Sequence, residues 1–194
     1  IWDQAAVDGV EPWIPDKHKN GHLPRHEGLD TLPPSLVEAI DAFLLASSVR
    51  NLRGQSADHS SMLVHVTRFV SVQDEVYRQV DEHIRHLRQR MQRQIGHEGI
   101  VERLKVLWES DFVPTTERVT RDPQSGVSDG IPKWDEIIES LPQVISDVHV
   151  RVINGSAKDT LDYSEHRERG LKVIAIGGDK LSRGLTLEGL SVSY

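Results

Sequence analysis

The residues best suited to chemistry lie in the stretch GGDKLSRG, residues 177–184. The two glycines that open it let the backbone approach a ligand closely. Free N–H groups that follow a strand, at the start of a turn or helix, bind anions. A lysine, an arginine and a serine would add two charges and a neutral donor. The stretch therefore predicts contact with a nucleic-acid backbone or a nucleotide γ-phosphate, and a tight turn with incidental charge is the open alternative. The candidate residues are Gly177, Gly178, Lys180, Ser182, Arg183 and Gly184.

Two other chemistries fit this stretch less well. The chain has neither the G-x-x-x-x-G-K-[ST] phosphate loop nor the G-x-G-x-x-G dinucleotide fingerprint. A nuclease needs clustered carboxylates with a lysine around a divalent ion, but Asp179 and Lys180 are too close together for the usual D/E-x-K spacing. The acids available to such a site are Asp159, Asp162, Glu165, Glu168 and Asp179. Those between 159 and 168 also fit the acidic start of a polar helix.

Three histidines near the start of the chain carry a spacing that a metal site could use. His18, His22 and His26 would stack on one face of a helix. Gly21 and Pro24 argue against a helix there. We therefore expect loop histidines in solvent and predict no metal site.

The candidate loop follows a predicted strand of a parallel sheet. Strands are predicted at 61–69, 148–153, 172–178 and 190–194, with a turn and short polar helix before the third. Strand, helix and strand at this spacing favour parallel pairing with a right-handed crossover. Parallel sheets bind ligands at the carboxyl ends of their strands. We expect three segments to line one such edge, adding Thr67, Arg68, Asn154 and Gly155 to the candidate site.

Helices are predicted at 35–49, 72–95, 100–108 and 134–145, the last limited by Pro142. Ser35 and Glu38 form a capping-box signature for the first. Residues 113–132 are predicted to be a loop, and 72–145 an insertion or an elaborated crossover between two strands. Residues 1–33, rich in Pro, Gly and His, predict an extended connector that Trp2, Trp13 and Ile14 could hold onto the body.

Arginines are concentrated in the second half of the predicted 72–95 helix. Arg85, Arg88, Arg90 and Arg93 could touch nucleic acid. Neighbouring acids offset them, so a solvated face is the favoured interpretation.

Composition is that of a soluble globular protein. The chain has 194 residues, of which 37% are hydrophobic and 27% charged, with no cysteine and no membrane-spanning run or signal peptide. The absence of cysteine fits the cytoplasm. Because the net charge is −7, any site for a polyanion must be a local patch. An initial Ile and an apolar end predict a fragment of a longer protein.

Three segments together resemble a known family. They are SMLVHVTRF, VINGS…LDYSEHRERG and VIAIGGDKLSRGLTLEGLSVSY, and from about Leu32 to Tyr194 the chain resembles the Z1 domain. That bacterial family carries an endonuclease label and is associated with superfamily-two helicase-like proteins. The last segment also resembles, more loosely, helicase motif V of the second RecA-like lobe.

The resemblance implies an α/β fold, with residues 34–194 as a RecA-like (P-loop NTPase-like) second lobe carrying a helical insertion at about 72–145. It places Ser182, Arg183 and Gly184 in the cleft between two motor lobes. It implies that Lys180 and the backbone of Gly177 and Gly178 face DNA or nucleotide. Thr186 stands where helicases have Asp, with Glu188 two residues on.

Two motor parts are absent from the sequence. There is no Walker lysine loop or D-E-x-H-type acid pair, and an arginine-finger motif would be expected only after Tyr194. The full-length protein is therefore expected to use ATP and Mg²⁺, DNA and a first ATPase lobe, with defence-system subunits as possible partners. The fragment alone is expected to be inactive and to hold no cofactor.

Three functions follow from these observations. The first is the second motor lobe of an ATP-dependent DNA translocase or helicase in restriction, repair or phage defence, where affinity would be strongly salt-dependent. The second is a non-catalytic interaction module that docks through the 72–95 helix. The third is a metal-dependent endonuclease.

Overall fold

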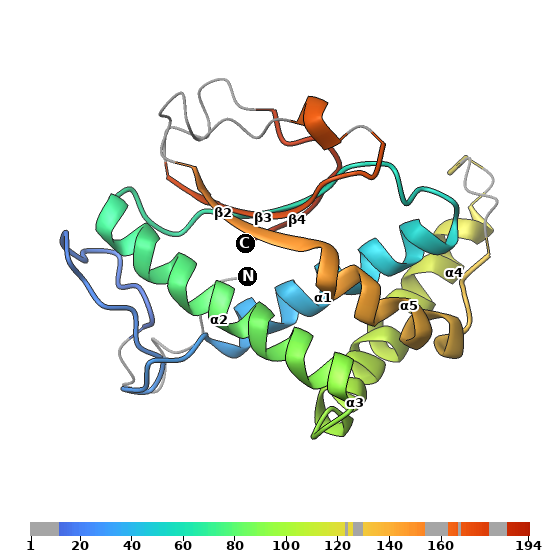
Figure 1. Cartoon of the computed structure of the whole chain (residues 1–194), viewed down its shortest axis with the longest axis horizontal. Coiled ribbons are helices and arrows are strands. Elements are labelled where there is room, and N and C mark those ends of the chain that lie inside the picture. The colour runs from blue at the N-terminus through green and yellow to red at the C-terminus, as the bar shows by residue number, and fades with distance from the viewer. Residues whose placement is uncertain (1–11, 123, 126–129, 154–162, 167, 179–185) are drawn as a thin grey trace.

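The computed structural model describes residues 12–122, 124–125, 130–153, 163–166, 168–178 and 186–194. Its centre is a four-stranded sheet in the order β2-β3-β1-β4, in which every neighbouring pair is parallel. The strands are β1 (Ser60–Val64), β2 (Val148–Ile153), β3 (Lys172–Gly177) and β4 (Leu190–Ser193). The chain is therefore an α/β protein, and the predicted parallel pairing is confirmed (Figure 1).

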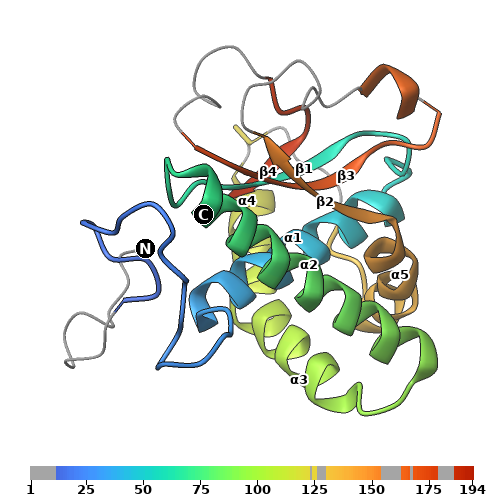
Figure 2. The ribbon, with the colours of Figure 1, turned by 60° about the vertical axis from the view of Figure 1, so that its left-hand side comes forward.

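The α-helices of the described chain lie on one side of this sheet (Figures 1 and 2). They are α1 (Pro34–Leu52), α2 (Val70–Arg93), α3 (Glu98–Leu107), α4 (Val113–Arg121) and α5 (Trp134–Asp147). A π-helical turn, η2 (Trp108–Phe112), joins α3 to α4, and a short 3-10 helix, η4 (Tyr163–His166), lies beyond the opposite face of the sheet. α1 and α2 pack directly against the sheet, which removes the apolar stripe of each from water.

The hydrophobic spacing of α2 explains its position. Its buried apolar residues recur every three or four positions, and they are Val72, Val76, Val80, Ile84, Leu87 and Met91. All of these except Val72 join one core with α1, α5 and two side chains of β3, Ile174 and Ile176. The predicted helices at 35–49, 72–95, 100–108 and 134–145 are confirmed within a few residues.

Four details differ from the sequence predictions. Residues 113–121 form α4 rather than a loop, because Pro114 occupies the first turn, where a missing N–H is tolerated. Pro142 lies inside α5 instead of limiting it. β1 ends at Val64 rather than at residue 69. Pro33, not Ser35, occupies the N-cap position of α1, where no side chain caps the helix. The Ser35 hydroxyl instead pairs with the Tyr194 hydroxyl at 2.8 Å.

The connector packs onto α2 through Trp13, as predicted. Trp13 is 2% exposed, and its indole N–H donates to Gln79 Oε1 at 3.1 Å. The Gln79 amide in turn donates to the Pro24 carbonyl at 2.8 Å. Residues 12–33 therefore extend along the body as an irregular, anchored segment. Among the described residues no helix is both long enough and apolar enough to span a membrane.

Candidate phosphate-contact edge

The carboxyl ends of β1 and β3 meet at one edge of the sheet. A Cβ placed on Gly178 would lie 2.8 Å from the Thr67 carbonyl oxygen and 3.2 Å from the Arg68 Cα. Both are backbone atoms that cannot turn aside, so only glycine fits there. The predicted meeting of the 67–68 and 177–178 segments is therefore confirmed for the residues that the structure describes.

Thr67 fixes this edge through its side chain. It is 5% exposed, and its Oγ1 accepts the Phe69 N–H at 3.1 Å, one residue before α2 begins. His18 Nε2 lies 2.7 Å from the same oxygen, while His18 Nδ1 lies 2.7 Å from the Pro15 carbonyl. A carbonyl only accepts, so Nδ1 carries the proton, and in the neutral ring Nε2 accepts from the Thr67 hydroxyl. His18 is thus half-buried and bonded, rather than in solvent as predicted.

Arg68 is the exposed cation of the edge. Its guanidinium lies 5.0 Å from the centre of the Phe69 ring, and the His18 ring meets Phe69 edge-on at 5.3 Å. Within the described parts of the chain no carboxylate forms an ion pair with Arg68. Among the described residues the arginine therefore has an aromatic partner and no acidic one, an arrangement suited to binding phosphate.

Gln73 belongs to the same edge, and the sequence analysis missed it. It lies in the first turn of α2, is 2% exposed, and donates its amide to the Thr67 carbonyl at 3.0 Å. Its Oε1 is buried and has no partner among the residues described. The available signal was a glutamine beside Val72 on the inward-facing stripe of an amphipathic helix.

Most of the other candidates lie outside the described residues. These are Asn154, Gly155, Lys180, Ser182, Arg183 and Gly184, together with the acids Asp159, Asp162 and Asp179. Glu168 is described, and it lines a cavity at the amino ends of the strands rather than the carboxyl edge. No group of three metal-binding side chains occurs within the described ranges.

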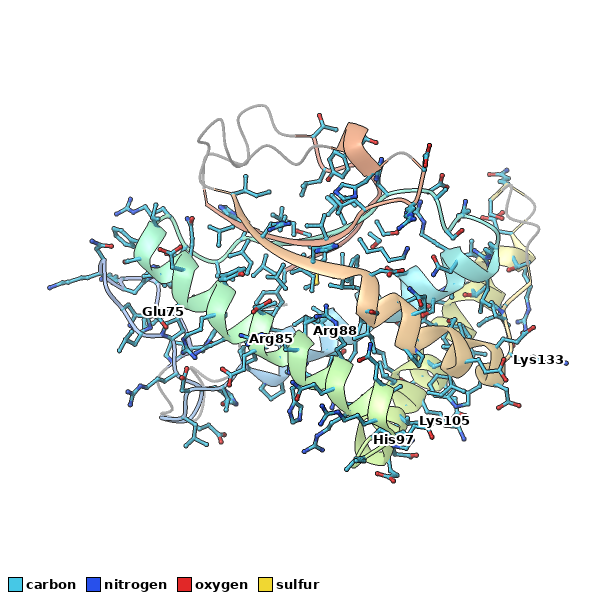
Figure 3. The ribbon with its side chains drawn as sticks, in the orientation of Figure 1. Glu75, Arg85, Arg88, His97, Lys105 and Lys133 are labelled. Atoms are coloured by element: carbon cyan, nitrogen blue, oxygen red, sulfur yellow. The ribbon has the colours of Figure 1, made fainter. Side chains whose placement is uncertain are left out.

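Three of the four arginines in the second half of α2, Arg85, Arg88 and Arg90, have protein partners. Arg85 pairs with Asp81 at 2.9 Å, and Arg88 donates to the Val148 carbonyl at 3.0 Å, where α5 passes into β2. Arg90 donates to the Gly96 carbonyl at 2.8 Å. Figure 3 shows Arg85 and Arg88 on this helix. These contacts support the favoured interpretation, a structural and solvated face, over a nucleic-acid surface.

The fold and this edge define an α/β protein with an all-parallel sheet and a basic, glycine-lined carboxyl edge. The model of the Z1 domain family matches residues 35–194, so the chain belongs to that family. No curated protein matches the chain, and no solved structure does.

Proposed function

We propose that this chain is the second RecA-like lobe of an ATP-dependent DNA translocase or helicase. In that role the carboxyl edge contacts the phosphates of DNA and completes an ATP site together with a first lobe. The parallel sheet supports this proposal, because its carboxyl edge is where open α/β sheets take ligands. Loop residues Lys180, Ser182 and Arg183 follow Gly178 directly in sequence and would extend the same edge.

One observation carries the proposal. The Gly178 backbone abuts the Thr67–Arg68 backbone, so the two strand ends present their main chains and the Arg68 side chain together. Backbone N–H groups and arginine are the groups that position proteins on a phosphodiester chain. Such contacts read no base sequence, as a translocating motor requires.

Replacing Arg68 with alanine is expected to weaken DNA binding by about 3- to 10-fold, as loss of roughly one phosphate contact would do. The slope of log affinity against log salt should fall by about 0.7–0.9. Fluorescence anisotropy with a labelled oligonucleotide, over a series of KCl concentrations, measures both quantities.

Arg85→Ala is the matched control, because Arg85 is paired with Asp81 on the exposed side of α2. It should leave affinity and salt slope nearly unchanged. If Arg68→Ala binds like the wild type while Arg85→Ala loses affinity, the DNA surface lies on α2 and the proposed edge is wrong. Metal-dependent cleavage of the same oligonucleotide would favour the nuclease instead.

We expect residues 1–194 alone to hydrolyse no ATP, with or without DNA. The sequence has no Walker lysine loop, and arginine fingers supply about 10³–10⁵ of the rate in related phosphoryl transfers. A phosphate-release assay with malachite green checks this expectation. Steady turnover that rises on addition of DNA would contradict it.

A further inference from the structure

A polar cavity lies at the amino ends of the strands. It is close to the point where α5 runs into β2, and Figure 1 shows that connection. It has a volume of about 560 Å³ and is walled by the ends of α1 and α5, the first residues of β2 and β3, and the segment before β3. Its lining includes Gln143 and the titratable residues Asp147, His149, His166, Glu168, Arg169 and Lys172. Its volume falls within the roughly 300–1,000 Å³ that is typical of sites for small molecules.

Lys172 is the unusual residue of this cavity. It is the first residue of β3, pairs in register with Ser60 and Val148, and is 3% exposed. No carboxylate of the described chain lies within ion-pair distance of its ammonium group. Burial lowers the pKa of Lys172, an effect that Asp147 opposes and Arg50 reinforces. Lysine is almost never this buried unless it is paired, so the position calls for an anionic partner.

The segment that carries Arg169 and Lys172 is held rigidly. Gly170 has φ +67°, and a Cβ there would lie 2.6 Å from the Asp58 carbonyl oxygen. The Leu171 N–H donates to His59 Nδ1 at 2.9 Å, and the Leu171 carbonyl accepts the Ser60 N–H at 2.9 Å. The cavity is thus preorganised, which reduces the entropy cost of binding.

Two histidine rings also line the cavity. The His149 and His166 rings lie 6.5 Å apart. Burial lowers the pKa of His149, and the nearby positive charge of Arg151 lowers it further, while Asp147 opposes the shift. A bound anion would relieve the desolvation of Lys172.

We propose that the amino-edge cavity binds a small phosphate-bearing molecule whose phosphate lies against Lys172 and Arg169. Phosphate offers several acceptor oxygens to such donors. The Asp147 carboxylate then accepts from hydroxyl groups on the rest of the molecule, and the Gln143 amide accepts from them or donates to them. The site is distinct from the carboxyl edge and does not depend on the function proposed for it.

Isothermal titration with ribose 5-phosphate tests this proposal. Lys172→Met should weaken binding by about 10- to 100-fold, the usual effect of losing a hydrogen bond to a charged group. Lys105→Met is the matched control, because Lys105 lies on α3, is 43% exposed and is 3.9 Å from Glu109. It should bind as the wild type does.

The ligand class is tested with inorganic phosphate and with ribose. Phosphate should bind more weakly than ribose 5-phosphate, and ribose should not bind detectably. If Lys172→Met proves poorly folded, lysine-selective NMR on the wild-type protein replaces the variant, and ribose 5-phosphate should shift the Lys172 resonance. No heat and no resonance shift with either phosphate probe, or equal binding by Lys172→Met and wild type, would overturn the proposal.

Discussion

Replacing Gly189 with alanine is expected to lower the free energy of unfolding by about 2–4 kcal/mol. Gly189 has φ +64°, which costs an L-residue about 1–2 kcal/mol. A Cβ there would overlap the His59 carbonyl oxygen and lie 2.7 Å from its carbonyl carbon. Overpacking of this kind costs about 1–3 kcal/mol more.

The position of Gly189 explains why the strain cannot be relieved locally. Its carbonyl accepts the Ser61 N–H at 3.0 Å, and the preceding carbonyl, of Glu188, accepts the Ser61 hydroxyl at 2.7 Å. These bonds hold β4 in register beside β1. Moving the turn outward would therefore break the first hydrogen bonds between β1 and β4, and this loss would lower the free energy of global unfolding.

Urea denaturation measures this loss, with Gly99→Ala as the control. Gly99 lies within α3, its Cβ would meet nothing within 4 Å, and its backbone is not in the left-handed region. Alanine there should stabilise the protein by up to about 1 kcal/mol. If both alanine variants unfold at the wild-type midpoint, the close packing of the turn on His59 is wrong.

Local patterns in the sequence were sufficient for the strands and most helices. The apolar residues from Val72 to Met91 are three or four positions apart, so only a helix places them all on one buried face. The apolar run before Gly178 required a strand covered on both sides, and every residue of β3 is buried. Parallel pairing then placed the 67–68 and 177–178 segments at one edge.

Contacts between residues far apart in the sequence could not be predicted from those local patterns. The hydrogen bond between the Thr67 hydroxyl and the His18 ring joins residues 49 apart in sequence, and no spacing rule indicates it. Lys172 is a lysine at the start of an otherwise apolar strand. The sequence does not show that α1, α5 and the 168–171 segment line one cavity with it, because these elements meet only in the folded structure. The 113–121 helix was missed because its Thr and Arg residues bury no side chain fully.

Replacing Arg103 with methionine is expected to destabilise the protein by about 2–3 kcal/mol at neutral pH. Asp41 of α1 is 1% exposed at its side chain, and Arg103 of α3 approaches it with two nitrogens. Removing one partner of a buried pair leaves an uncompensated charge, which costs about 3–5 kcal/mol. The Arg103 side chain is 41% exposed, so solvent reduces that figure.

The loss should depend on pH in a direction that the pKa of Asp41 sets. Burial raises this pKa above its ordinary value of 3.8, and the hydrogen bond from Arg103 lowers it again. Without Arg103 the pKa of folded Asp41 rises further. A raised carboxyl pKa stabilises the fold below the unfolded value, and that stability is lost as pH rises through the folded value. The difference between variant and wild type should therefore be small near pH 4 and grow toward neutral pH.

Chemical denaturation of three variants separates charge from packing. Adding Asp41→Asn to Arg103→Met should recover much of the neutral-pH loss, because no buried charge then remains. Arg121→Met breaks only the exposed pair with Glu117, whose nitrogen–oxygen distance is 3.0 Å, and should cost about 0.3–0.5 kcal/mol. A loss for Arg103→Met that is equal near pH 4 and at neutral pH, and unchanged by Asp41→Asn, would mean that the arginine stabilises α1 and α3 through its aliphatic stem rather than through its charge.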